Sequence, residues 1–396
     1  FYVRAGPFFA TFGHGLTLRS YEDIDLEHDT VLDGLMAEYS FGDISVEALT
    51  GLALDDVPGP AYTEHVVRAA RASMPLTQWG EIAGSVVERS RTNKDEDVEL
   101  PGSIARFEDS LIGTELNVWA GPVTLSAEYA GRNGENPVTG EGELEGHATY
   151  ASATVALDVV TLFGEFKDYD DYDHYLVNPP TGVRDHLWTL MNRATYQPDL
   201  NDETGFLVEG SAPVGERLYL MGGASEARRH DAELRHWEMY GQIDWELTDV
   251  IAGSVAGSRS REYLYSGGES TGKFTEHVIG ALEVELSLPS DRVLEVSLEG
   301  QSVDDPDGES YEDYIVSAAY YPTYDLTLIG TMEGTNADVS DGRESWFMAE
   351  MRKLLSDDLE VSLSAGTERG GKKCTGGVCF VEPEFEGVRL RLTKFF

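Results

Sequence analysis

The sequence has few basic residues for its length and almost no cysteine. Its 396 residues include 29 Lys and Arg against 72 Asp and Glu, so the formal net charge is −43. We expect no nucleic-acid partner, because neutralising phosphates requires clustered Lys and Arg. The only cysteines are Cys374 and Cys379, and a zinc site would have to recruit distant ligands. A local disulfide formed in an oxidising compartment is the simpler interpretation.

Long apolar runs, a leader and catalytic motifs are also missing. No run of about 18 apolar residues occurs, which excludes a transmembrane helix. Residues 1–6 read as strand with no charged and apolar leader before them, so either a leader was removed or the chain starts inside a longer one. Helical periodicity is nowhere sustained, and the nine His residues show no ligand spacing. With no nucleophile elbow, His-Glu-Xaa-Xaa-His or haem-attachment motif, we expect neither an enzyme nor a cofactor.

What the chain does contain is the period-two alternation of β-strands. Leu and Val alternate with Glu and Ser in residues 282–288, and the pattern returns in residues 294–299, 359–364 and 123–128. Such strands have one apolar and one wet face. Aromatic residues make up 10% and hydrophobic residues 41% of the chain, which favours an ordered protein over a disordered acidic one.

Short turns alternate strictly with long polar loops. Turns are expected at residues 41–43, 121–122, 158, 214–215, 248–249, 289–290, 323–324 and 356–357 and around Pro75, and loops at residues 93–109, 133–145, 170–203, 263–272, 304–311, 336–341 and 370–383. This alternation is typical of a transmembrane β-barrel with short periplasmic turns and long extracellular loops. Nine hairpins plus the first and last segments predict an all-β, antiparallel barrel of about 20 strands, with residues 1–396 as a single domain in the outer membrane of a Gram-negative bacterium.

The C-terminal strand ends on Phe396 after apolar residues at every second position. It resembles the assembly signal that outer-membrane barrels present to the barrel assembly machinery, although Lys394 departs from the pattern. Besides this machinery and membrane lipid, a partner protein in the lumen or at the loops is a further expected contact.

Inward-facing positions follow from the alternation if the apolar residues face lipid. The predicted lumen-lining residues are Glu128, Glu165, Asp244, Glu246, Glu283, Glu285, Glu295, Glu299, Glu360, Arg389 and Arg391. Three interpretations of this acidic wall remain open: a cation-preferring pore, a merely solvated wall, or adaptation to high salt. The function predicted is a porin-like channel for small hydrophilic solutes, and the alternative is a scaffold or sleeve that houses a partner protein in a secretion, surface or electron-transfer assembly.

Two acidic stretches and one long loop are candidates for further sites. Residues 168–174 are rich in oxygen ligands but lack the glycine turn and closing Glu of a calcium loop, and residues 304–309 read as a solvated turn. We therefore predict no metal site. The loop at residues 170–203 is long enough to fold inward as a constriction or plug.

Two motifs carry a family resemblance. Residues 13–23 read Gly-His-Gly-Leu-Thr-Leu-Arg-Ser-Tyr-Glu-Asp and are followed by His-Asp-Thr-Val-Leu-Asp-Gly at residues 28–34. Residues 368–379 contain Arg-Gly-Gly followed by the paired cysteines. With these motifs the chain resembles an uncharacterised family of bacterial outer-membrane barrels, domain of unknown function 6029. The resemblance implies a fold and a location but no activity. Members usually have residues upstream of the first motif, which implies that N-terminal strands are missing here and that 20 is an undercount.

Both motifs also have a direct physical interpretation. Gly13 and Gly15 permit a tight or bulged backbone, after which Arg19 and Glu22 could pair inside the lumen and anchor a loop; a bend at the barrel rim is the alternative. The two cysteines flank Gly376 and Gly377 at a hairpin tip, where a bridge would rigidify an exposed loop, or serve a redox role.

Overall fold

A computed structural model describes residues 1–23, 28–55, 63–93, 106–135, 143–174, 176–266, 269–306, 308, 310–337, 342–375 and 378–394. Its main element is a sheet of 20 strands, the number expected from the hairpin count. These strands are β1 Tyr2–Phe8, β6 Leu32–Phe41, β7 Ile44–Asp55, β8 Thr63–Thr77, β9 Gly80–Asn93, β10 Arg106–Ala120, β11 Val123–Glu135, β12 Glu143–Ala156, β13 Thr161–Asp170, β14 Asp202–Val214, β15 Leu218–Arg228, β16 Leu234–Thr248, β17 Ile251–Ser266, β18 Glu269–Leu288, β19 Arg292–Asp304, β20 Tyr311–Thr323, β21 Leu326–Thr335, β22 Ser345–Ser356, β23 Leu359–Glu368 and β26 Phe385–Lys394.

The remaining elements are short and lie in the connections. Residues 9–31 and 171–201 and the hairpin before β26 hold all of them. They are β2 Thr11–Phe12, β3 Leu18–Arg19, β4 Glu22–Asp23, β5 His28–Asp29, α1 Thr189–Arg193, β24 Gly371–Thr375 and β25 Val378–Glu382. Among the described residues, no helix has the length and apolar character to cross a membrane.

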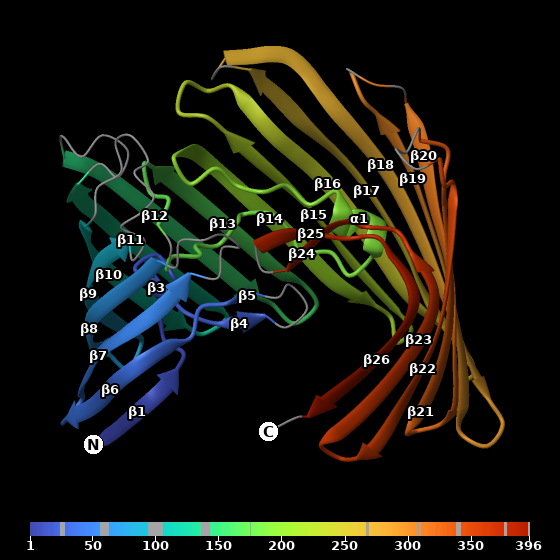
Figure 1. Cartoon of the computed structure of the whole chain (residues 1–396), viewed down its shortest axis with the longest axis horizontal. Coiled ribbons are helices and arrows are strands. Elements are labelled where there is room, and N and C mark those ends of the chain that lie inside the picture. The colour runs from blue at the N-terminus through green and yellow to red at the C-terminus, as the bar shows by residue number, and fades with distance from the viewer. Residues whose placement is uncertain are drawn as a thin grey trace.

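Each strand of the main sheet pairs antiparallel with the next one along the chain, from β1 with β6 to β23 with β26. Figure 1 shows this sheet curving around an interior, with both chain ends at the end of the short turns. The end strands β1 and β26 share no register in the described part of the chain. The transmembrane antiparallel barrel expected from the alternation is the fold that forms.

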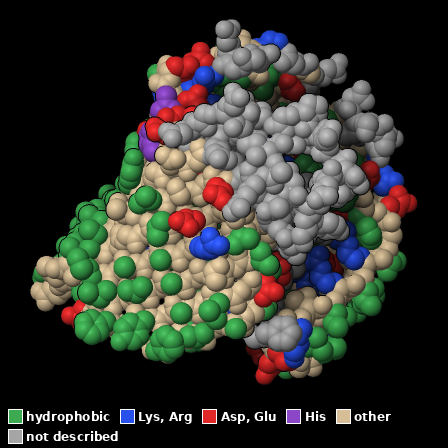
Figure 2. All heavy atoms as spheres, turned by 60° about the vertical axis from the view of Figure 1, so that its left-hand side comes forward, with side chains coloured by type: hydrophobic (Ala, Val, Ile, Leu, Met, Phe, Trp, Pro, Cys, Tyr) green, Lys and Arg blue, Asp and Glu red, His purple; other side chains and the backbone are tan. Residues whose placement is uncertain are grey.

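The registers confirm the two-faced strands. Leu282 lies opposite Leu298, and Glu285 lies opposite Glu295, so apolar residues face apolar ones and acids face acids. Figure 2 shows hydrophobic side chains spread over the outer face with few charged groups among them. This is the arrangement that a lipid-facing wall requires.

Two boundaries differ from expectation. The turn placed around Pro75 lies at residues 78–79, because β8 continues to Thr77 and Pro75 pairs with Glu81 within the sheet. The long loop expected at residues 263–272 is wrong, because β17 extends to Ser266 and β18 begins at Glu269. Strand pairing continues there because polar residues can pair by their backbones outside the lipid as well as within it.

A hydrophobic core lies on the inner face of the first half of the sheet. Leu49, Val67, Val87 and Leu111 of β7–β10 are buried there with apolar residues of the inner connections. The prediction that apolar residues face lipid is therefore wrong at these positions. They point inward because residues 9–31 and 171–201 cover them, and each large side chain buried this way stabilises the fold by about 1.5 to 3 kcal/mol.

Candidate functional site

Three connections fold into the interior and define the candidate site. We call residues 9–23 with 28–31 the first inner segment, residues 171–174 with 176–201 the second inner segment, and residues 371–375 with 378–382 the Cys hairpin. Figure 1 shows α1 of the second segment inside the curved sheet beside β24 and β25 of the Cys hairpin. The inward fold predicted for the long loop is thus what the structure contains.

The first inner segment is seated against the wall through its glycines. Gly13 has a φ of +56° and Gly15 a φ of +88°, a region that only glycine adopts at low cost. The backbone N–H of His14 donates to Glu128 Oε2 at 2.5 Å, and a Cβ on Gly13 would lie 2.4 Å from that oxygen. The glycine therefore supplies both the turn and the close approach to Glu128.

The two inner segments are bonded to each other. Tyr172 donates its hydroxyl to the Leu16 carbonyl at 2.8 Å, and the Arg19 backbone N–H donates to the Leu176 carbonyl at 2.7 Å. The Arg19 guanidinium donates to the Asn178 carbonyl at 3.1 Å rather than to Glu22, the partner considered for it. Of the two alternatives for this motif, the anchored loop inside the lumen is the one that forms.

A buried ionic cluster ties the second inner segment to the wall. Asp109 of β10 accepts two bonds from Arg89, at 3.0 and 2.7 Å, and lies 3.4 Å from Arg132. His174 contacts the same carboxylate at 3.1 Å, and Arg132 donates to the Asp173 carbonyl at 2.6 Å. Burial, opposed by the bond to Asp109, lowers the pKa of His174 to about 4, so this imidazole is neutral at pH 7.

Further along, the same segment is held by three more wall carboxylates. Glu203 is ion-paired with Lys167 at 2.5 Å and accepts the Tyr196 hydroxyl at 2.5 Å. Glu238 contacts His186 at 2.7 Å. Glu333 pairs with Arg193 at 2.5 Å and with Arg369 at 3.2 Å. The segment therefore crosses the interior from β10 to β21.

One of the predicted lumen residues, Glu299, binds the N-terminus of helix α1. Glu299 accepts the backbone N–H groups of Thr189 at 3.1 Å and Leu190 at 2.8 Å. Both N–H groups lack a partner within the helix, and a carboxylate satisfies them. Glu299 thus fixes the position of α1 on β19.

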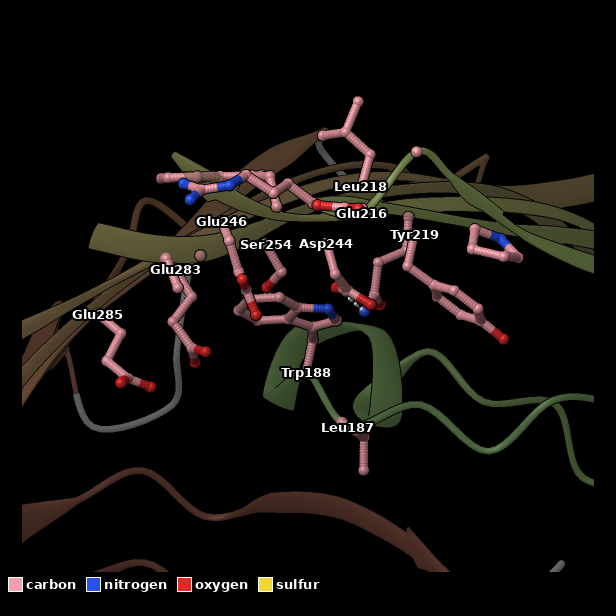
Figure 3. A pocket seen from close by; sticks show the side chains of 17 residues that line it. Leu187, Trp188, Glu216, Leu218, Tyr219, Asp244, Glu246, Ser254, Glu283 and Glu285 are labelled. Carbon is pink, nitrogen blue, oxygen red and sulfur yellow. Dashed lines mark hydrogen bonds between the residues drawn. The ribbon is translucent and has the colours of Figure 1, made fainter. Parts of the chain in front are cut away.

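Next to α1, on the short-turn side, lies a cavity of about 620 Å³ that we call the acidic cavity. Its wall carries Asp244, Glu246, Glu283 and Glu285 from β16 and β18, and the second inner segment contributes Leu187 and Trp188. Figure 3 shows the Trp188 ring reaching toward Asp244, Glu246 and Ser254, while Leu187 points away from the sheet. The arrangement concentrates negative charge beside an aromatic ring, a combination that attracts cations.

The other predicted lumen residues lie outside this cavity. Glu295 sits opposite Glu285 and accepts the Tyr321 hydroxyl at 3.4 Å, and Glu165 accepts that of Tyr150 at 2.5 Å. Glu360 is half-buried at the register position of Thr393.

The two cations predicted on the last strand differ from each other. Arg389 is 3.4 Å from Glu368 and lies over the Phe385 ring, whereas Arg391 is exposed. The pairing with acids of a neighbouring strand considered for these arginines is therefore found for Arg389.

Several residues that build the site were missed by sequence reasoning. Asp109, Arg89 and His174 lie on different segments, and nothing in their local sequence marks them as partners. Trp188 was missed because it stands in a loop with no periodic pattern. A signal that could have indicated the buried ionic cluster is the positive charge at the inward positions Arg89 and Arg132. Buried guanidiniums there need a carboxylate nearby.

The acidic stretch considered for calcium is used as an anchor instead. Tyr169, Tyr172 and His174 are buried, and Asp168 lies 3.3 Å from His147 and 3.4 Å from His230. Among the described residues, no group of three or more His, Cys, Asp or Glu side chains is arranged so that it could hold a metal ion. The second acidic stretch, residues 304–309, is described only in part.

The Cys hairpin packs on α1 through β24, where Gly371 and Lys372 are half-buried, whereas Val381 of β25 is 75% exposed. Lys372 donates to the Thr195 carbonyl, and the register sets Cys374 opposite Cys379. The hairpin is held to the second inner segment by this bond to the Thr195 carbonyl. Its tip, residues 376–377, and the terminal Phe396 lie outside the described residues, and the disulfide and the assembly signal stay predictions.

Comparison with known proteins relates the chain to one family and to several solved structures. The model of a family of unknown function, DUF6029, matches residues 1–210. No curated protein matches the chain. Three solved structures are similar: the siderophore receptor PirA from Acinetobacter baumannii (9% identity, 92% of this chain and 70% of that one, TM-score 0.50), the ferric enterobactin receptor PfeA in complex with BCV-L6 (10%, 99% and 72%, 0.51) and a mutant of PfeA from Pseudomonas aeruginosa (8%, 92% and 69%, 0.50).

At such low identity the likeness to these receptors shows the fold. It is the fold of a bacterial outer-membrane β-barrel, in agreement with the predicted location. Neither the family description nor the names of the receptors indicates an enzyme.

Proposed function

Because this chain belongs to the DUF6029 family, whose description names no activity, we propose from its geometry that it is an outer-membrane transport barrel. Residues 1–396 form its barrel domain, and its path for small hydrophilic solutes prefers cations. The names of the similar receptors support transport in general. The siderophore class is not carried over, because a ferric catecholate is anionic and the acidic cavity would repel it.

The convergence of carboxylates on one cavity is the observation that carries this proposal. Asp244, Glu246, Glu283 and Glu285 line it together, and Arg217, the one cation among the described residues of its wall, is paired with Asp249 at 3.0 Å. Glu285 also lies directly opposite Glu295, a like-charge pair that costs the sheet about 0.2 to 1 kcal/mol. A wall that only needed solvated residues could use Ser or Thr there at no such cost.

The inner segments make selectivity by charge effective. Their apolar residues pack on the inner face from β6 to β13, so that solutes pass close to the remaining wall. A unit charge about 8 Å from a carboxylate in water is stabilised by about 0.5 kcal/mol before salt screening. Several carboxylates together are sufficient to select by sign.

The test is the reversal potential of the refolded chain in a planar bilayer under a salt gradient. We expect ohmic steps with cation preference, and a decrease of about three- to tenfold in the cation-to-anion permeability ratio when Glu283, Glu285 and Glu295 are all changed to Gln. The control removes the same charge from exposed positions near the long loops, Glu145→Gln with Glu312→Gln and Glu344→Gln.

Equal loss of selectivity in both triple variants would assign the preference to net charge alone. A folded barrel that stays electrically silent would overturn the channel and favour the sleeve for a partner protein.

We also propose that a bridge between Cys374 and Cys379 joins β24 to β25 and rigidifies the Cys hairpin. The two residues are register partners, as a cross-strand bridge requires. A mass increase on alkylation only after reduction would support the bridge, and alkylation of the untreated folded chain would exclude it.

A further inference from the structure

A second cavity, separate from the acidic cavity, lies between the two inner segments at the level of the long loops. We call it the outer pocket; its volume is about 570 Å³. The first inner segment contributes Arg19 and Tyr21, the second contributes Asn178, Gln197 and Asp199, and β17 contributes Glu262. The second inner segment reaches this level where it joins β13 and β14 at Asp170 and Asp202.

The walls of the outer pocket are fixed before any ligand arrives. Asn178 donates to the Tyr21 hydroxyl at 2.9 Å and accepts from Arg19 at 3.1 Å, and the Arg19 guanidinium lies 5.1 Å from the Tyr21 ring centre. On the opposite side, Arg235 pairs with Asp199 at 2.8 Å. Fixed walls lower the entropy cost of binding.

Two polar side chains in the pocket are left over from this framework. Gln197 and Glu262 are exposed, and within the described residues neither side chain makes a hydrogen bond. An amide both donates and accepts, whereas a carboxylate only accepts. The free groups therefore suit a ligand whose own groups do both.

The charges of the pocket exclude the two simpler ligand classes. Asp173, Asp199 and Glu262 line the pocket with Arg19, while Arg235 pairs with Asp199 and Lys372 lies near Glu262, so the charges nearly balance and an anion gains no net attraction. A compact cation would share the pocket with the Arg19 guanidinium, and it has no acceptor for the Gln197 amide N–H groups.

A neutral polyhydroxylated ring meets all of these conditions. Each hydroxyl donates to the carboxylates and accepts from the amide and guanidinium, while its C–H faces can pack on Pro179, Pro198 and Tyr21. The volume lies in the range of small-ligand sites, about 300 to 1,000 Å³. We propose that the outer pocket binds a neutral saccharide of one or two rings.

The experiment is isothermal titration calorimetry of the full chain, refolded in a detergent without a sugar headgroup. The probes are maltose, cellobiose and diacetylchitobiose, with spermidine and citrate as the charged alternatives. We expect at least one disaccharide to bind, and Gln197→Ala and Glu262→Gln each to weaken its binding about three- to tenfold, the effect of one lost hydrogen bond.

The matched control is Glu246→Gln in the acidic cavity, which should leave disaccharide affinity unchanged while it lowers cation selectivity. Silence from all three disaccharides, binding by a charged probe alone, or equal affinity in Gln197→Ala, Glu262→Gln and parent would each overturn the saccharide pocket. None of these results bears on conductance, so the transport proposal is tested separately.

Discussion

Asp109 offers the sharpest test of whether the second inner segment is held by its buried ionic cluster. In Asp109→Ala the guanidiniums of Arg89 and Arg132, whose side chains are 7% and 5% exposed, lose their shared carboxylate. Breaking a buried pair by removing one partner costs about 3 to 5 kcal/mol. Because His174 and the Asp173 carbonyl attach to the same cluster, much of this cost is relieved when the segment leaves the wall.

A cost of about 4 kcal/mol changes the docking equilibrium roughly a thousandfold. Trypsin can report it, since Arg184 and Arg193 lie within the second inner segment and are held by Glu209 and Glu333 in the docked form. We expect faster cleavage in folded Asp109→Ala and a larger single-channel conductance. Asp109→Asn, which keeps the shape and one acceptor, should fall between the parent and Asp109→Ala.

The matched control is Arg71→Ala on the same inner wall. Arg71 pairs with Glu115 at 2.8 Å, with side chains 22% and 12% exposed, and its other ion pair is with Glu81 of β9 rather than with the second inner segment. It should change neither cleavage nor conductance. If Asp109→Ala still migrates as a folded barrel on a gel but is cleaved and conducts like the parent, the anchoring by Asp109 is refuted.

Three further predictions concern the inner segments. The pKa of His174 is lowered to about 4 when the segment is docked, from an ordinary 6.5. Docking is therefore at full strength above about pH 6.5 and weakens by up to about 3 kcal/mol as the pH falls toward 4. Conductance should rise between pH 6.5 and 4, and His174→Gln should flatten this rise. Gly13→Ala places a Cβ at positive φ and 2.4 Å from a carboxylate oxygen. The control is Gly42→Ala, where φ is +60° but the added Cβ would meet no atom within 4 Å, so that only the backbone strain of about 1 to 2 kcal/mol applies. The free energy of unfolding, measured in urea, should fall more in Gly13→Ala than in Gly42→Ala. Glu299→Gln should weaken the start of α1 by about 1 kcal/mol, seen as faster amide exchange there, whereas Glu295→Gln should not; equal exchange in both would contradict the capping role.

The strands could be predicted because their causes are local. Alternation such as that of residues 282–288 reflects a wall with lipid on one side, and a short turn must join two strands at the same end of the sheet. The error at residues 263–272 has the same origin. Polar residues there indicate departure from lipid, which does not by itself end strand pairing.

The interior could not be predicted because its contacts join distant positions. Glu299 meets Leu190 across 109 residues and Asp109 meets His174 across 65, and no local pattern encodes either pair. The glycines at positions 13 and 15 were recognisable as a special backbone. Their contact with the Glu128 carboxylate could not be predicted, because it depends on how the whole first inner segment packs against the wall.

The inward acids divide into two groups that alternation alone cannot separate. Glu128 and Glu299 are buried and accept backbone N–H groups of the inner segments. Their carboxylates therefore bind those segments and are not open to solutes. Asp244 and Glu246 face an open cavity, and Arg217, the cation on the described part of its wall, is paired with Asp249 instead. A uniform response to salt would place carboxylates on exposed surface and would not select buried positions as anchors. Anchoring and solute selection are therefore separable functions of one acidic wall, and Glu299→Gln and Glu246→Gln are the pair of variants that separates them.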